Sequence, residues 1–467
     1  MSNRLKDTLL VLGGAIVVVA IVGLSLTETS MLLLVLGGLA ALPLLFLPAW
    51  WLPSIALCLL VAVPRQLFAN SDILNSFSLA LLVVVIWRLR DIGARPGDSN
   101  PAGGDRKRFI YTLLIVYVLW MTLVTLVAGL APFRVTYIAA FVLSVFLPLT
   151  SRSPRAARAL LSTWQVLAVV VAAYCAVEFL LRENPIYDPL IAAAGGDAIQ
   201  HWSVYRASAS LGHPLYAGLF LCIAFAIGVG RKLEGGTQRH IWAAAAALIG
   251  VLLTVSRNSL GAAGMAAAVL VLASILSSKS RVSGGARFLF AIVLGLGLFA
   301  AAQSTVFQER ASSAEADSST AARSALFDLT VTTANAYKWL GAGAASAADA
   351  AAPFNANGIY IEGAYFQLVI SLGIPGLAMF LLIVIASILR ALRHGRYAAA
   401  GVMIAYAISI GFTPVLESLR SYLLVFGFAL WLCWSKTALS DGPTDEADLE
   451  PATDQHAAKS NPAFATR

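Results

Sequence analysis

Charged residues are scarce in this chain, and their scarcity excludes most classes of soluble protein. Only 12% of the 467 residues are charged and 59% are hydrophobic, whereas soluble domains contain about 45–50% apolar and about 25% charged residues. Uncharged hydrophobic runs follow one another along most of the sequence. Such runs are typical of helices that cross a membrane, so we predict an all-α, polytopic membrane helix bundle.

Cysteine is also rare, and nothing in its distribution indicates a metal site. The four cysteines, Cys58, Cys175, Cys222 and Cys433, lie within hydrophobic runs and lack the spacing of metal ligands. We expect them to be small core residues, and we predict neither a metal nor a cofactor. The sequence also lacks the internal repeat found in transporters that are built from two similar halves.

Acidic residues are outnumbered by basic ones, which gives a net charge of +8. A basic chain can bind nucleic acid, but here the Lys and Arg residues form short clusters between hydrophobic runs. Topology determinants of membrane proteins are distributed in this way. We therefore expect membrane lipid, and no nucleic acid, as a partner.

The hydrophobic runs predict 12 to 14 transmembrane helices, since a span needs about 20 apolar residues or fewer inside a bundle. The run at 51–64 is short and could instead be re-entrant. Arg4 and Lys6 precede the first run, which we interpret as a retained helix and not a cleaved signal peptide. The predicted ranges are 8–27, 31–48, 51–64, 73–88, 109–130, 134–150, 159–181, 214–230, 240–255, 259–277, 288–303, 362–389, 398–412 and 421–435.

Orientation follows from the basic residues of the short loops, because cytoplasmic loops carry an excess of Lys and Arg. A cytoplasmic N-terminus places most of them inside. Residues 1–437 are then the transmembrane bundle, with 304–361 as a large extracytoplasmic loop that contains short helices. Residues 92–105 and 438–467 have the composition of a disordered cytoplasmic linker and tail. The basic residues left outside are Arg65, Arg134, Arg182, Arg206, Arg257, Arg310, Arg323, Lys338 and Arg420.

Two of these external arginines are candidates for a functional site. Arg257 lies in the segment TVSRNS (254–259), which is so short that the guanidinium must lie at the mouth of the bundle, where an ionisable group is a functional candidate. Arg206 lies in a segment of small and polar residues that leads into a helix at Pro214. His213 precedes this proline and can equally be a simple helix-entrance residue, because proline favours the first helical position.

The large loop carries a third candidate. Residues 319–346 begin with a Ser/Thr cap signal and continue with an amphipathic pattern at Leu326, Phe327 and Leu329. This pattern predicts a helix across the extracytoplasmic mouth, with Arg323 in its first turns. Arginine is suited to bidentate capture of phosphate oxygens. Several arginines converging on one cavity would form an anion site for a diphosphate leaving group.

Four segments, in this order and around the large loop, carry a family resemblance. They are YRASASLGHPLYAG (205–218), LTVSRNSLGA (253–262), the Arg323 segment closing in WLGAGAAS (339–346), and EGAYFQLVISLGIPGLAMF (362–380). This ordered set resembles the O-antigen ligase and O-antigen polymerase superfamily of bacterial inner-membrane glycosyltransferases. The resemblance covers about residues 200–390.

The resemblance implies a metal-independent, inverting transfer of a glycan from an undecaprenyl diphosphate carrier, with arginines holding the diphosphate. On this chain it assigns Arg206, Arg257 and Arg323 to the clamp that holds the diphosphate, with Arg257 and Arg323 as catalytic residues. Ligases typically have His-Asn where this chain has Glu362 and Gly363, and a carboxylate can serve as general base. We therefore assign Glu362 as the base, although a Glu at a helix start is also favoured by the helix dipole. The residues assigned to substrate binding are Arg206, His213, Arg310 and Tyr205.

We predict a polymerase of lipid-linked oligosaccharide repeat units that makes O-antigen or exopolysaccharide at the periplasmic face. The alternatives are a ligase that moves finished glycan to lipid A core and, from another class, a transporter or flippase. A flippase would need ionisable residues along a path through the membrane, whereas here they gather at the external mouth. The expected partners are the undecaprenyl-diphosphate-linked oligosaccharide, membrane lipid and a chain-length regulator protein. The expected location is the bacterial inner membrane, with both termini cytoplasmic.

Overall fold

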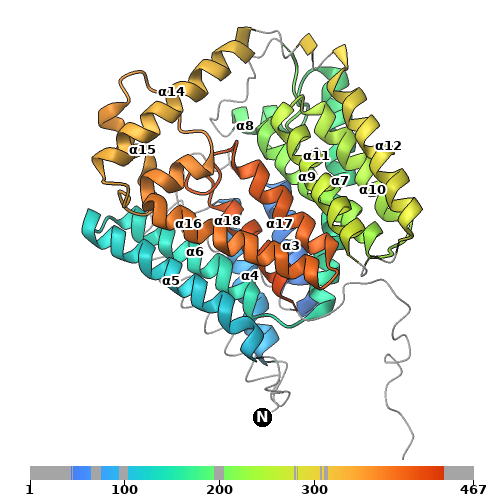
Figure 1. The fold of residues 1–467 in the computed structure, drawn as a ribbon, viewed down its shortest axis with the longest axis horizontal. Helices are drawn as coiled ribbons and strands as arrows, with labels where there is room; N and C mark the ends of the chain where they lie inside the picture. Colours follow the sequence, from blue (N-terminus) through green and yellow to red (C-terminus); the bar gives the residue numbers. More distant parts are fainter. Residues whose placement is uncertain are drawn as a thin grey trace, which may run out of the picture.

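The computed structural model describes residues 44, 46–64, 75–93, 104–193, 204–277, 280, 282–305, 308–309 and 314–435. Within these residues all regular structure is helical (Figure 1), which confirms the all-α prediction. The α-helices are α3 (Leu52–Ala62), α4 (Ser76–Gly93), α5 (Gly104–Ala128), α6 (Pro132–Thr150), α7 (Pro154–Leu181), α8 (Tyr187–Ala193), α9 (Pro214–Leu233), α10 (Arg239–Leu253), α11 (Arg257–Leu276), α12 (Gly284–Ala302), α14 (Ala314–Ala336), α15 (Ala347–Ala351), α16 (Ala364–Arg393), α17 (Tyr397–Ile410) and α18 (Ser421–Trp434). Short 3-10 helices are η2 (Ala49–Trp51), η5 (Ala209–Leu211) and η6 (Ala352–Phe354).

The helices form a polytopic membrane bundle, as predicted. Among the described residues, 6 helices are long and apolar enough to cross a membrane, namely Lys107–Ala128, Pro132–Thr150, Pro154–Leu181, Pro214–Leu233, Arg257–Leu276 and Ala364–Arg393. The helices α10, α17 and α18 are apolar but shorter. Nearly every residue of α17 and α18 is buried, so other helices cover them and they need not match the lipid thickness. The predicted span at 8–27 and nearly all of the span at 31–48 lie outside the described residues.

Helix α9 lies at the centre of the bundle and packs against α10, α11 and α17. Small residues allow this close packing. A Cβ at Gly230 would lie 2.3 Å from the backbone nitrogen of Ala398, and a Cβ at Gly228 would lie 2.6 Å from the carbonyl oxygen of His240. Close backbone approach through small residues is the usual way in which membrane helices associate.

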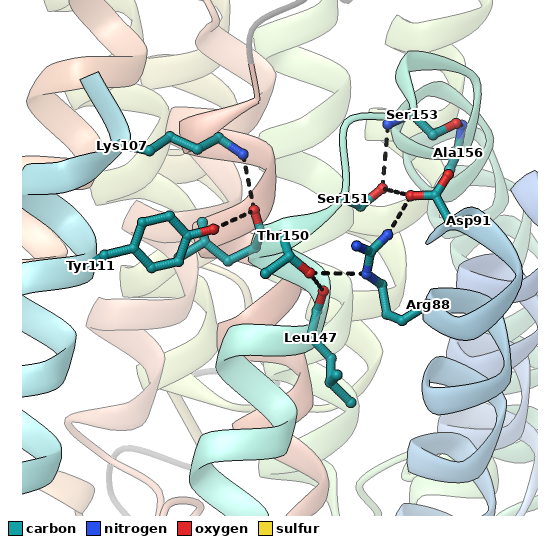
Figure 2. Close-up of polar contacts among 10 residues, drawn as sticks. Arg88, Asp91, Lys107, Tyr111, Leu147, Thr150, Ser151, Ser153 and Ala156 are labelled. Atoms are coloured by element: carbon teal, nitrogen blue, oxygen red, sulfur yellow. Dashed lines mark hydrogen bonds and ion pairs between the residues drawn. The ribbon is translucent and has the colours of Figure 1, made fainter. Parts of the chain in front are cut away.

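One end of the bundle, which we call the basic end, gathers cationic side chains (Figure 2). Arg88 forms an ion pair with Asp91, and its Nε donates to Thr150 Oγ1 over 3.0 Å. Lys107 Nζ donates to the carbonyl oxygen of Leu149 over 2.9 Å. Cations are favoured at a helix C-terminus such as that of α6, where backbone carbonyls lack helical partners. We call the opposite end, where α9, α11 and α16 begin, the loop end.

The side of the membrane that each end faces can be tested with a reporter enzyme that is active only outside the cytoplasm. We expect the reporter to be active when fused near Ala345, at the loop end, and silent when fused at Gly235 or Gly284, at the basic end. The reason is the excess of Lys and Arg predicted on the cytoplasmic side. The opposite pattern at any of the three positions would overturn the orientation.

Helix α16 departs from the single continuous helix predicted for 362–389. Its backbone breaks at Gly373, which has φ 71° and ψ −177°, two residues before Pro375. The segment at 339–343, within the large loop, packs against this break, and a Cβ at Gly373 would lie 2.3 Å from the carbonyl oxygen of Trp339. Only glycine permits both the positive φ and this contact.

The break is closed by hydrogen bonds from distant parts of the chain. Ala342 N donates to Ile370 O and Gly343 N donates to Ser371 O, both over 2.9 Å. The indole Nε1 of Trp120, on α5, donates to Leu372 O over 2.8 Å. The large loop is therefore bonded to backbone groups that an unbroken helix would have used internally.

Helix α14 forms in the large loop, as predicted, but it is 23 residues long and begins before the predicted cap signal. Leu326 and Leu329 are buried against Ile361 and Ile370, whereas Phe327 is 57% exposed. The prediction for Phe327 is therefore wrong. Leu326 and Leu329 are three residues apart and share one face of the helix, whereas Phe327, the residue after Leu326, is rotated away from that face by about 100°. Figure 1 shows α14 at the upper edge of the molecule.

Candidate functional site at the loop end

The segment that carries Arg206 is fixed to the turn between α10 and α11. Ala207 N donates to the carbonyl oxygen of Leu253 over 3.1 Å, and Arg206 Nε donates to the carbonyl oxygen of Thr254 over 3.2 Å. Arg206 is buried, while Arg257, the first residue of α11, is exposed. The structure thus brings the Arg206 side chain onto the turn from which Arg257 projects.

The N-termini of α9 and α11 meet at this turn. Ser256 is the N-cap of α11, and its side chain accepts a hydrogen bond from Ser259 N over 3.2 Å. A Cβ at Gly218, in the first turns of α9, would lie 2.0 Å from Ser259 Oγ. Val255 has a φ of 47°, which is a rare conformation for a β-branched residue and is typical of functional sites. Two helix N-termini side by side, with their positive dipole ends, favour an anion.

His213 is the N-cap of α9, and its Nδ1 accepts a hydrogen bond from Leu215 N over 3.2 Å. Burial lowers its pKa to about 4, and the positive charge of Arg206 contributes to the same shift. His213 is therefore neutral at neutral pH. This geometry fits a helix-entrance residue, and any contact with substrate would be made by an uncharged ring.

Tyr205 has a partner within the protein. Its hydroxyl donates a hydrogen bond to Glu178 Oε1 over 2.9 Å. The pKa of Tyr205 is raised, first by burial and then by the charge of Glu178. The assignment of Tyr205 to substrate binding stays a prediction. Its hydroxyl proton is already donated to the Glu178 carboxylate.

Arg323 and Glu362 lie on elements that pack together elsewhere at the loop end. Arg323 is exposed and, because α14 begins at Ala314, it lies in the interior of this helix and not in its first turns. Leu326, one turn later, belongs to the apolar cluster that includes Ile361. Glu362 follows directly and is exposed. It precedes the N-cap Gly363, whose φ is 94°, so it lies outside α16.

The segment at 411–420, together with the start of α18, lies between the turn that carries Arg257 and the elements that carry Arg323 and Glu362. On one side Tyr422, at the start of α18, packs against Tyr216 of α9 with ring centroids 6.0 Å apart. On the other side Gln367 of α16 donates to Ser418 Oγ over 3.3 Å. Arg310 lies outside the described residues.

Glu417, in this connecting segment, was not predicted from the sequence. Its Oε2 accepts a hydrogen bond from Ala347 N over 3.1 Å. Burial raises its pKa to about 7, although hydrogen bonds from Ser371 and Ala347 act in the opposite direction. Glu417 thus joins the start of α15 to α16 near the break. A single acidic residue in a largely apolar stretch was the available signal, as it was for Glu178 in the run at 159–181.

A small cavity lies beside the Arg206 segment, between α3, α7, α9 and α18. Its volume is about 50 Å³, and its walls include Leu57, Val61, Trp164, Ser210, Leu219 and Tyr422. Ser210 belongs to η5, four residues after Arg206. The lining is mainly apolar, with the hydroxyl groups of Ser210 and Tyr422 among it.

Comparison with protein families gives one match in this region. The family model described as O-antigen ligase matches residues 242–381. This stretch is less than a third of the chain, and it contains the α10–α11 turn with Arg257, helix α14 with Arg323, and Glu362 just before α16. A comparison with curated proteins gives no match. The family match supports the resemblance found in the sequence and indicates a membrane enzyme of polysaccharide biosynthesis.

Proposed function

We propose that this multi-pass membrane enzyme, of the O-antigen ligase and polymerase type, polymerises undecaprenyl-diphosphate-linked oligosaccharide repeat units at the periplasmic face of the bacterial inner membrane. The product would be an O-antigen or an exopolysaccharide. The observation that carries the proposal is the placement of Arg206 on the turn that presents Arg257. Two helix N-termini meet at this turn, which therefore suits an anionic diphosphate.

In the proposed reaction a hydroxyl group of an acceptor oligosaccharide attacks the anomeric carbon of the donor. A new C–O bond forms on one face of the sugar while the bond to the diphosphate breaks on the other, so the configuration inverts. Undecaprenyl diphosphate leaves with the bonding electron pair, and the arginines stabilise the charge that it gains. The proton of the attacking hydroxyl passes to a base, for which Glu362 is our candidate.

A glutamate at position 362 favours a polymerase over a ligase, since family ligases typically have histidine there. The alternative activity remains the transfer of finished glycan to lipid A core. The transporter alternative is disfavoured by the placement of the arginines. Arg206, Arg257 and Arg323 all lie at the loop end and do not mark a path between the two ends of the bundle.

The test is reconstitution of the purified protein in lipid nanodiscs with a single lipid-linked repeat unit as the sole substrate. We expect a ladder of longer lipid-linked glycans together with release of undecaprenyl diphosphate. Adding a chain-length regulator protein should narrow the ladder without being required for it. Transfer only when lipid A core is supplied would show a ligase, and movement of substrate across liposomes without diphosphate release would show a flippase.

A further inference from the structure

A fully buried carboxylate lies directly behind the Arg206 segment. Glu178 is in the last turn of α7 and is 0% exposed. Its Oε1 accepts hydrogen bonds from the hydroxyl of Tyr205 (2.9 Å), from Ser208 N (3.0 Å) and from Ser208 Oγ (3.3 Å). Its Oε2 accepts a fourth hydrogen bond from Ala209 N over 2.8 Å. All four donors belong to the segment at 205–209.

Burying the Glu178 carboxylate costs free energy, which the four hydrogen bonds must offset. A buried carboxylate loses its hydration and is tolerated only when its oxygens are well paired. Here two of the donors are backbone N–H groups of an irregular segment in which Ala209 has a φ of 50°. The carboxylate therefore supplies acceptors that regular secondary structure would otherwise provide.

The donors to Glu178 flank Arg206 in the sequence on both sides. Between them, Ala207 N and Arg206 Nε bond in a different direction, to the carbonyl groups of Leu253 and Thr254. The segment is thus held between α7 and the α10–α11 turn, with Arg206 as the side chain that crosses to the turn. Without the carboxylate, the residues before and after Arg206 would lose these four hydrogen bonds.

We propose that Glu178 is a positioning residue that fixes Arg206 for binding of the donor diphosphate. It acts through the backbone of the segment at 205–209 and does not contact the substrate. The proposal rests on the proposed function, because it takes the ligand of Arg206 to be a polyprenyl diphosphate. It adds a residue outside the stretch matched by the family model.

The experiment measures donor KM, kcat, thermal stability and binding of undecaprenyl diphosphate for the full-length protein in nanodiscs. Glu178→Gln keeps the shape but replaces one acceptor oxygen by a donor group that would face the N–H or O–H groups of the segment. We expect the donor KM and the Kd for undecaprenyl diphosphate to rise about tenfold, with a smaller change in kcat. Tyr205→Phe removes one of the four donors, leaves the others in place and should change KM in the same direction by about threefold.

The matched control is Gln165→Leu, in the same helix. Gln165 is buried in the N-terminal half of α7, where its Oε1 lies 2.7 Å from His240 Nδ1. Gln165→Leu should lower thermal stability without changing the donor KM. If Glu178 were only structural, Glu178→Gln would behave like this control.

A double-mutant cycle tests whether the effect passes through Arg206. Arg206→Ala should raise the donor KM, and adding Glu178→Gln should then change KM by less than about twofold. Multiplicative effects, or an unchanged KM in both Glu178→Gln and Tyr205→Phe, would overturn the proposal. If Glu178→Gln does not fold, the cycle of Tyr205→Phe with Arg206→Ala decides, because a direct contact of Tyr205 with substrate would act independently of Arg206. Absence of undecaprenyl diphosphate binding by the unmodified protein would instead refute the proposed function.

Discussion

Replacing Arg257 or Arg323 by lysine is expected to remove most of the polymer while the protein still inserts into the membrane. Lysine keeps the positive charge but loses the planar fork that holds two phosphate oxygens at once. Contacts that stabilise transition-state charge contribute about 3–4 kcal/mol, which corresponds to a hundredfold to a thousandfold loss in rate. The measurement is polymer yield and initial rate at matched expression.

Both arginines are exposed, so their replacement should not disturb packing. The matched control is Arg182→Lys, because Arg182 is also an exposed arginine at the loop end, where it caps α7. This variant should make normal polymer. Full activity in both Arg257→Lys and Arg323→Lys would show that the diphosphate is held elsewhere.

Glu362→Gln is expected to abolish extension and to make the lipid-linked single repeat unit accumulate. Donor binding by the arginines survives this change, whereas removal of the acceptor proton does not. The competing explanation is that Glu362 merely interacts with the dipole of α16, which is worth about 0.3–1 kcal/mol. In that case the variant would make nearly normal polymer. Analysis of lipid-linked glycans by chain length separates the two outcomes.

The structure places Glu362 outside α16 and exposed, so neutralising it should leave the fold intact. Asp328→Asn is the matched control, since Asp328 is another exposed carboxylate of the large loop, on α14. It should leave polymer length unchanged. Wild-type polymer from Glu362→Gln would remove this residue from the mechanism and leave catalysis to stabilisation of the leaving group.

Much of the helical architecture could be predicted because its signals are local. Hydrophobic runs, Pro132 and Pro214 at helix starts, and the polar turn around Arg257 mark helix boundaries within a few residues of those observed. Pro375 signals a kink in α16, but the positive φ at Gly373 could not be predicted, because glycine occurs inside many membrane helices. Its partner at 339–343 is some thirty residues away, and a single sequence does not reveal such pairing.

Part of the candidate site could likewise be predicted from the sequence, and part of it could not. The order of segments indicated Arg206 and Arg257 as residues of one site, and the structure brings the Arg206 side chain to the α10–α11 turn. The sequence could not show that His213 caps α9, because this depends on which ring nitrogen faces Leu215 N. It also could not show that Glu178 receives its four donors from residues about thirty positions later. The roles of Glu362 and Arg323 stay predictions, and so does that of Arg310.

The break in α16 imposes an order on biogenesis. The carbonyl groups of Ile370 and Ser371 have their partners in Ala342 and Gly343, and that of Leu372 has its partner in Trp120 of α5. A nascent chain in which the segment at 339–343 and α5 had not yet docked against α16 would leave these groups unpaired, at a cost of several kcal/mol for each buried group. The bent form of α16 therefore becomes stable only after α5 and the large loop have docked against it, and a chain stalled before that step would expose polar backbone groups at the break.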